Sequence, residues 1–331
     1  MEKIAFFLDG TAVGWSGIIL ILAPLGSALL FLGLYLGKTG NAPAAFATVP
    51  LALVLSVLFA RLLHWYCYTE TYDSLLSAMT DYSSGGFGLL GVFAGCFAAA
   101  LITRLLKLHH SLPAMLDCMC LAGLAGISVG RFSAFFTTAD RGQVLSTLRS
   151  LPLAYPVTNA VSGATEYRLA TFAIQALAAA LLFVGLWLFF RRKTSAEGDT
   201  ALLFSLLYSC TEVVLDSTRY DSMYFRWNGF VSIVQVVGAV ALVFAIVVFS
   251  RRLVKSRGFR PLYAFAWGLI LCGIGGAGYM EYHVQRHGSQ ALFAYSVMSA
   301  CLVLVALLTL VIRHMAEKKP AASTAGRHLK A

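Results

Sequence analysis

The sequence predicts an all-α membrane protein whose helices cross the bilayer many times. Of its 331 residues, 59% are hydrophobic and only 12% are charged, and the mean hydropathy is +0.78. These values lie far outside the usual range of soluble domains. The apolar residues also gather in runs of about 20, which is the length that a helix needs to cross the hydrocarbon core. The composition therefore excludes a soluble globular enzyme.

Nine such runs are predicted as membrane spans. They cover residues 13–37, 44–66, 85–106, 113–137, 169–190, 200–217, 228–250, 261–281 and 290–313. The sixth run is the shortest and the least apolar. Each of the other runs is long enough for about five or more turns of helix.

The lysines and arginines predict how these spans are oriented. If the N-terminus lies outside, sixteen of them fall in inner segments and seven in outer segments, as the positive-inside rule requires. The odd number of spans then places the C-terminus inside. The net charge of +10 is mostly a signal of this topology, so we expect no nucleic-acid partner.

The seven cysteines give no sign of a metal site. They lie within predicted spans or at the end of one, and no CxxC or paired Cys/His spacing occurs. We interpret them as small core residues and expect neither a metal ion nor another cofactor.

The second span ends in an arginine followed by an aromatic cluster. Arg61 lies in its outer third and either snorkels to the interface or enters a polar site. We interpret His64 as a packed or interfacial histidine and not as a ligand. The next segment, residues 69–84, carries three acidic residues and no basic one, and its apolar positions predict a short helix on the surface.

Glycines gather at the outer mouth of the third span. Gly85, Gly86 and Gly88 would let another backbone or a ligand approach closely. Tight helix packing, which small residues also serve in membranes, explains them equally well. Both interpretations stay open.

The fourth span carries an arginine where hydrocarbon is expected. Arg131 lies roughly 9 Å below the predicted outer end, and a guanidinium at the bilayer centre costs about 2.5–3.5 kcal/mol on insertion scales. It therefore needs a partner or a task. Asp117, in the same span, lies near the cytoplasmic end. The connection that follows, residues 138–168, is the longest outer loop and a candidate lid or substrate guide.

The sixth span carries two carboxylates on one face. Glu212 and Asp216 are four residues apart and therefore share a helix face, and Arg219 follows them. The predicted topology places six charged residues from four spans in the outer half of the membrane: Arg61, Arg131, Arg168, Glu212, Asp216 and Arg219. We expect them to converge on one polar cavity, from which Asp117 is too distant.

Several short motifs occur in an order that resembles the prolipoprotein diacylglyceryl transferases. They are ARL at 60–62, GGFGLLGV at 85–92, Asp117 followed nine residues later by GISVGRFSAFF, and SIVQ at 232–235. Members of this bacterial family move a diacylglyceryl group from phosphatidylglycerol to the cysteine of a lipoprotein signal peptide. The resemblance implies that both molecules are partners of this chain and that it lies in the plasma membrane.

The resemblance also implies how the chain is divided. Residues 1–250 are expected to form a transferase-like core of seven spans, and residues 251–315 to add two further spans. Apart from the resemblance, the composition of residues 316–331 predicts a disordered basic tail in the cytoplasm.

Single residues match the family unevenly. Arg131 falls on the arginine of the family's glycine–arginine signature, while Asp216 and Arg219 fall on an acidic residue and a following arginine. Three positions depart from the pattern: Gly86 replaces a histidine, Ala134 replaces an asparagine and Glu212 replaces an arginine. The departures bear on catalysis more than on the fold.

The resemblance gives these groups tasks. Arg131 would hold the lipid phosphate, because a guanidinium matches phosphate oxygens two at a time. Further substrate-binding residues would be Arg61, Gly85, Gly86, Gly88, Arg168 and Arg219. The thiol, with an ordinary pKa of about 8.5, needs a base, and Glu212 or Asp216 would supply it. The alternative is that these carboxylates are structural partners of Arg131, and the two roles can coexist.

Two other functions remain as alternatives to diacylglyceryl transfer. One is a catalytically silent relative that binds a phospholipid or another anionic lipid-linked ligand, and the missing histidine and asparagine suggest it. The other is a transporter, which the gathering of charges in one half of the membrane disfavours.

Overall fold

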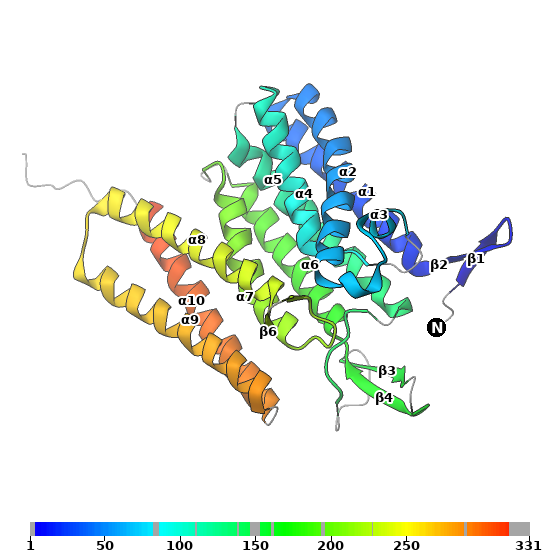
Figure 1. Cartoon of the computed structure of the whole chain (residues 1–331). Helices are drawn as coiled ribbons and strands as arrows, with labels where there is room; N and C mark the ends of the chain where they lie inside the picture. Colours follow the sequence, from blue (N-terminus) through cyan, green and yellow to red (C-terminus); the bar gives the residue numbers. More distant parts are fainter. Residues whose placement is uncertain are drawn as a thin grey trace, which may run out of the picture. The chain divides into compact units, whose positions relative to one another are not determined.

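Helices dominate the structure, a computed structural model, and confirm the predicted all-α membrane class (Figure 1). The structure describes residues 4–81, 86–109, 111–137, 139–145, 153–159, 162–192, 196–226, 228–287 and 290–317. Gly85 and the part of the predicted tail beyond residue 317 lie outside the described residues.

Each predicted span contains a helix. In the described part of the chain, eight helices are long and apolar enough to cross a membrane. They are α1 (Trp15–Thr39), α2 (Ala42–Cys67), α5 (Leu112–Gly130) with its continuation η2 (Arg131–Phe136), α6 (Thr171–Phe190), α7 (Asp199–Ser217), α8 (Ile233–Arg257), α9 (Pro261–His287) and α10 (Ala291–Glu317). The predicted third span is α4 (Leu89–Leu105), which is apolar but has only 17 residues. The chain is thus a multi-pass membrane protein, while the number and orientation of the crossings stay predictions.

Side-chain caps fix where the helices begin. Asn41 accepts a hydrogen bond from the Ala44 N–H at 3.1 Å, and Ser111 accepts one from the Ala114 N–H at 3.3 Å. These bonds satisfy N–H groups that have no partner within the helix. Gly40 ends α1 in the left-handed region at φ 67°, where glycine has no steric cost.

Two glycines of α4 allow it to lie directly against α2 (Figure 1). A Cβ atom at Gly95 would lie 2.5 Å from the carbonyl group of Leu55, and one at Gly91 would meet the backbone of Phe59 and Ala60. The spacing of four residues places both glycines on one face, so the two backbones approach closely, as is common for helices in membranes.

Three short β-hairpins lie at the helix ends, and the sequence patterns did not predict them. They pair β1 (Ile4–Leu8) with β2 (Thr11–Gly14), β3 (Ala154–Thr158) with β4 (Thr165–Leu169), and β5 (Tyr224–Phe225) with β6 (Asn228–Ser232). The second lies in the long connection 138–168. Each strand has five residues or fewer, too short for an alternating pattern to stand out.

The segment that was expected to hold a surface helix does hold one. α3 (Leu75–Thr80) is preceded by the single turn η1 (Thr69–Thr71). Ser74 caps α3 by accepting a hydrogen bond from the Ser77 N–H at 3.1 Å. The expected short helix between the second and third spans is confirmed.

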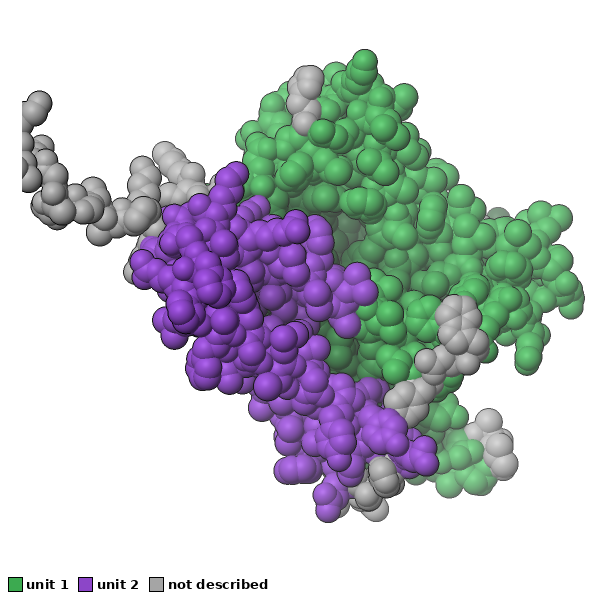
Figure 2. Space-filling model, turned by 60° about the vertical axis from the view of Figure 1, so that its left-hand side comes forward, with its two compact units in different colours: residues 1–238 green, residues 239–331 purple. Residues whose placement is uncertain are grey.

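The chain forms two compact units, coloured separately in Figure 2. The first, residues 1–238, holds all elements up to the start of α8, and the second, residues 239–331, holds the rest of α8 with α9 and α10. In the second unit a Cβ atom at Gly273 of α9 would lie 2.7 Å from Val305 of α10, so these helices pack closely. The domain border at residue 250 rests on the resemblance and stays a prediction.

Candidate active site

Arg131 lies at the end of α5, where the helix tightens into η2, and its guanidinium is buried. Its Nη1 atom lies 2.7 Å from Asp140 Oδ2, and its Nη2 atom lies 3.1 Å from Glu212 Oε1. The structure thus pairs Arg131 with Glu212, one of the two carboxylates considered as its structural partners. Two carboxylates compensate a charge that would otherwise be costly among the helices.

A second arginine shares one of these carboxylates. Arg219 follows α7, and its Nη2 atom lies 2.6 Å from Asp140 Oδ1. The same group lies 3.1 Å from Asp221 Oδ1, and Nη1 lies 3.6 Å from Asp216 Oδ1. The carboxylate of Asp140 therefore lies between the guanidinium groups of Arg131 and Arg219, with one oxygen facing each.

The backbone around Asp140 holds this carboxylate in place. Its N–H donates to Asp221 Oδ2 at 2.8 Å, and it has a left-handed φ of 56°. Two residues later, Gly142 donates to the Leu169 carbonyl at 2.8 Å and forms a β-bridge with Arg219. A Cβ atom at Gly142 would lie 2.5 Å from Thr171 Oγ1. Only glycine fits this close approach, and it fixes the turn that carries Asp140.

The two arginines determine the ionisation of Asp140. Burial alone would raise the pKa of this carboxyl, but Arg131 and Arg219 outweigh burial and lower it to about 2. In the same way burial disfavours the charged form of Arg219, but Asp140, Asp221 and Asp216 together outweigh burial, so the pKa of Arg219 is raised. Both groups are therefore charged at neutral pH.

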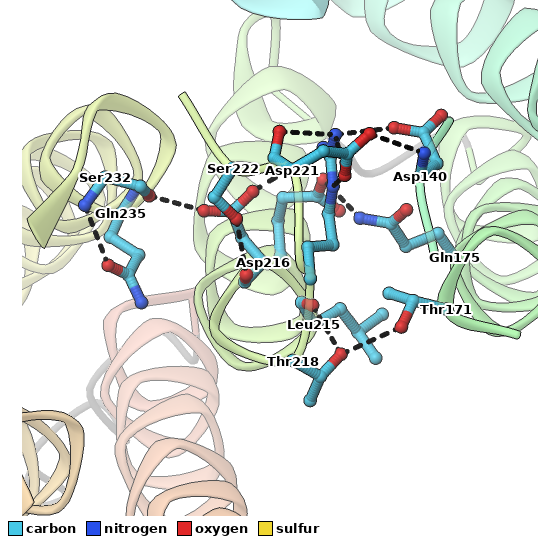
Figure 3. Close-up of polar contacts among 12 residues, drawn as sticks. Asp140, Thr171, Gln175, Leu215, Asp216, Thr218, Asp221, Ser222, Ser232 and Gln235 are labelled. Carbon is cyan, nitrogen blue, oxygen red and sulfur yellow. Dashed lines mark hydrogen bonds and ion pairs between the residues drawn. The ribbon is translucent and has the colours of Figure 1, made fainter. Parts of the chain in front are cut away.

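The predicted carboxylates of α7 are held by further side chains (Figure 3). Glu212 Oε1 accepts a hydrogen bond from Gln175 of α6 at 2.8 Å. Asp216, which is 1% exposed, accepts a hydrogen bond from the Ser232 hydroxyl through Oδ2. Each carboxylate thus has an arginine and a neutral donor, which suits a fixed ion-pair network.

The guanidinium of Arg61 donates its hydrogen bonds to backbone carbonyls in and after α3. It is 1% exposed, so it does not snorkel outward. Its Nε donates to the Ala78 carbonyl at 2.8 Å, Nη1 to the Gly86 carbonyl at 3.0 Å, and Nη2 to the Asp81 carbonyl. These bonds tie the end of α2 to the end of α3 and to Gly86.

Arg168 also lies outside the ion pairs of Arg131. It is part of β4, its Nη2 atom lies 3.0 Å from Glu166 Oε2, and its guanidinium lies 4.5 Å from the centre of the Tyr220 ring. Tyr220 directly follows Arg219, so the hairpin reaches the neighbourhood of the cluster. Its expected task in substrate binding stays a prediction.

The glycines before α4 leave room for neighbouring side chains. Gly86 has a φ of 84°, and a Cβ atom here would lie 2.7 Å from His64 Cε1. The imidazole of His64 thus fills the space beside the position where the resemblance places a histidine. At Gly88 a Cβ atom would lie 2.9 Å from Leu63. Both contacts fit the packing interpretation, and Gly85 lies outside the described residues.

Asp117 has a different task, as expected from its depth. Its carboxylate lies 3.1 Å from Lys38 Nζ and accepts hydrogen bonds from the N–H groups of Gly198 and Ala201, both at 2.9 Å. These groups open α7, so Asp117 clamps the start of that helix. Ala134, in turn, packs in an apolar cluster with Ala170 and Phe172.

Three polar residues of the cluster were missed from the sequence. Asp140 and Asp221 lie in turns beyond the helix ends, where helical spacing gives no information on direction. Gln175 lies in a span, but an amide among apolar residues did not stand out beside the charges. One signal was available in the sequence. The guanidinium of Arg131 has five N–H donors, so a single predicted carboxylate partner left donors that needed further acceptors.

The comparisons with known proteins agree on one family. The sequence profile described as prolipoprotein diacylglyceryl transferase matches residues 3–251. Curated proteins named phosphatidylglycerol–prolipoprotein diacylglyceryl transferase are similar over most of this length. The one from Finegoldia magna is 23% identical over 261 residues, covering 77% of this chain and 99% of the relative. Those from Streptococcus suis and Clostridium kluyveri are 25% and 24% identical, covering 68% and 78% of this chain and 84% and 99% of the relatives.

Proposed function

The chain belongs to the prolipoprotein diacylglyceryl transferase family, and we propose on this premise that it transfers a diacylglyceryl group from phosphatidylglycerol to the cysteine of a prolipoprotein signal peptide. The named relatives and the profile support this reaction. The reaction takes place in the outer half of the bacterial plasma membrane, where both substrates are embedded.

One observation carries the assignment of the site: the buried guanidinium groups of Arg131 and Arg219 converge on the single carboxylate of Asp140. A lipid phosphate offers the same kind of oxygens to the same two forks. When phosphatidylglycerol binds, its phosphate takes the place between the arginines, and the side chain of Asp140 swings away from them. The arginines then stabilise the charge that gathers on the glycerol phosphate as it leaves.

The contacts favour a supporting task for the carboxylates of α7. Glu212 is engaged by Arg131 and Gln175, and Asp216 by Arg219 and Ser232. A carboxylate that holds an arginine in place keeps the guanidinium aimed at the substrate. In this arrangement Glu212 and Asp216 orient the two arginines, and the thiol needs another base.

A groove beside α2 offers space for lipid. A cavity of about 480 Å³ is lined by Leu53, Val54, Val57, Leu58 and Met79, with Arg61 among them. An apolar lining of this size suits part of an acyl chain.

A mass measurement tests the proposal. The purified protein is mixed with phosphatidylglycerol and a peptide that carries the signal-sequence cysteine, and the peptide is weighed by mass spectrometry. We expect the added mass of one diacylglyceryl group. A peptide with serine in place of cysteine, and phosphatidylethanolamine in place of phosphatidylglycerol, are the controls and should give no product. An unmodified cysteine peptide beside folded, lipid-bound protein would favour a silent lipid-binding relative.

A further inference from the structure

His64 lies in the last turn of α2, in a pocket of polar and aromatic side chains. Its Nδ1 atom forms a hydrogen bond with the Tyr72 hydroxyl at 2.9 Å. Its ring lies 4.7 Å from the Tyr68 ring and 5.7 Å from the Tyr72 ring, centre to centre. The absent side chain of Gly86 provides the space that the imidazole occupies. The imidazole is therefore held in one orientation and is not loose at the interface.

The second ring nitrogen of His64, Nε2, is free to accept a proton from a bound substrate. In the described part of the chain Nε2 has no hydrogen-bond partner. His64 is half-buried, and Nε2 is not fully enclosed by protein atoms. When Nδ1–H donates to the Tyr72 hydroxyl, the lone pair of the neutral ring lies on Nε2. A held Nδ1 with an accessible Nε2 is the arrangement of a general base.

The end of α2 packs against the segment that carries Arg219. Gly88 lies between Leu63 of α2 and Met223, because a Cβ atom there would meet both side chains. Arg226 Nε donates to the Tyr66 carbonyl at 2.5 Å. These contacts join α2, just before and just after His64, to residues 223–226.

Tyr68, which packs on the imidazole, also lies near the charges of the cluster. Burial is the main cause that raises the pKa of Tyr68, and Asp221 raises it further while Arg219 lowers it. Only nearby charges have such an effect. Together with the contacts of Gly88 with Met223 and of Tyr66 with Arg226, this places the pocket of His64 against the segment that follows Arg219.

We propose that His64 is the general base that activates the substrate thiol, an inference that rests on the proposed function. Nε2 takes the proton as the S–H bond breaks. The thiolate forms the new S–C bond with the glycerol carbon of the lipid while the C–O bond to the phosphate breaks. Glycerol phosphate leaves with the electron pair of that bond, and the imidazolium then gives its proton to this anion or to water. Tyr68 and Tyr72 face the imidazole, and the charged group nearby is Arg61, whose guanidinium lies 5.3 Å from the centre of the Tyr72 ring.

The expected size of the effect follows from the thiol itself. With a pKa of about 8.5, roughly 3% of the peptide thiol is ionised at pH 7, so a base can contribute at most about 30-fold there. At pH 9.5 about 90% is already thiolate, and the base contributes little. A residue with only a structural task would lower the rate by the same factor at both pH values.

The experiment compares His64→Gln with the unchanged protein in the mass assay, from pH 6.5 to 9.5. We expect a loss of ~10- to 30-fold at pH 7 that shrinks to under ~3-fold at pH 9.5. His64→Ala should regain part of its rate with added imidazole. His314→Gln, which changes an exposed histidine at the end of α10, is the matched control and should keep the full rate.

Three results would overturn the inference, and they are distinct. An unchanged rate for folded His64→Gln, or a loss that is equal at all pH values, would remove His64 as the base while leaving the proposed function intact. No thioether from the unchanged protein at any pH would overturn both. If His64→Gln fails to fold, Tyr72→Phe replaces it, because this variant keeps the imidazole and removes only its hydrogen bond. Its rate should fall ~3- to 10-fold at pH 7, and the difference from the unchanged protein should again shrink towards pH 9.5.

Discussion

At the scale of single residues, the charge balance of the cluster bears on the proposed binding of the lipid phosphate. The two guanidinium groups of Arg131 and Arg219 face the carboxylates of Asp140, Glu212, Asp216 and Asp221. A phosphate adds further negative charge, so at least one carboxylate must withdraw when the lipid binds. Asp140 lies between both arginines and comes from a turn, whereas Glu212 and Asp216 come from a helix. We therefore expect the Asp140 carboxylate to move when the lipid phosphate binds.

Acid should weaken the folded state through Asp140. Its pKa is lowered to about 2 in the folded protein, against about 3.9 when unfolded. A lowered folded pKa stabilises the protein above pH 4, and the contribution of about 2 kcal/mol is lost as the pH falls from 4 to 2. Thermal unfolding in detergent should show this loss in the unchanged protein. Asp140→Asn should unfold earlier at pH 6 and lack this part of the acid dependence, and an equal acid dependence in both proteins would contradict the assignment.

A lysine at position 219 should not replace the arginine. Arg219 contacts three carboxylates with its planar fork, and an ammonium group cannot reproduce this geometry. We expect Arg219→Lys to lower kcat/KM for phosphatidylglycerol at least ~10-fold, or about 1.4 kcal/mol. Arg313→Lys, at an arginine of α10 paired with Glu317, is the control and should stay within ~2-fold. Equal values for both variants would remove Arg219 from the site.

At the scale of elements, the sequence predicted the helices well and the turns poorly. The expected fourth span, 113–137, matches α5 and η2 at 112–136, because a run of apolar residues has to cross a fixed thickness. The β3–β4 hairpin and the turn of Asp140 depend on pairing between distant segments, such as Gly142 with Leu169. Local patterns carry no record of such pairings. This is why half of the acidic groups in the cluster could not be predicted.

The packing of α4 on α2 should depend on its glycines. A Cβ atom at Gly95 would lie 2.5 Å from the backbone of Leu55 and Ser56, so Gly95→Leu has to push the helices apart. Overpacking of this kind costs about 1–3 kcal/mol or more, and we expect a clear fall in the unfolding temperature in detergent. Gly33→Leu in α1 is the control, because nothing lies within 4 Å of a Cβ atom there. Equal unfolding temperatures for the two variants would contradict the close packing.

At the scale of the whole molecule, the family match and the compact units do not end at the same residue. The profile covers residues 3–251, which includes nearly all of the first unit and the first part of the second. α9 and α10 lie beyond the match. They add two long apolar helices. If both cross the membrane, the chain returns to the side on which α8 ends.

The orientation can be tested with fusions to a fluorescent protein that folds only in the cytoplasm. The positive-inside rule predicts an inner C-terminus, so a fusion after residue 331 should fluoresce. A fusion after Arg286, at the end of α9, should end on the outer side and stay dark. Fluorescence of the second fusion and none of the first would reverse the topology and place the Arg131 cluster in the inner half.

The most direct test of the account is the rate of thioether formation by Arg131→Ala. Arg131 is the guanidinium that bridges α5, the Asp140 turn and α7, and loss of such a preorganised donor costs about 10²–10³-fold in rate. The peptide, phosphatidylglycerol and mass assay are those used for the unchanged protein, and folding is checked by thermal unfolding. The account predicts a rate at least ~100-fold lower in folded protein. A rate within a few-fold of the unchanged protein would show that the lipid phosphate binds elsewhere.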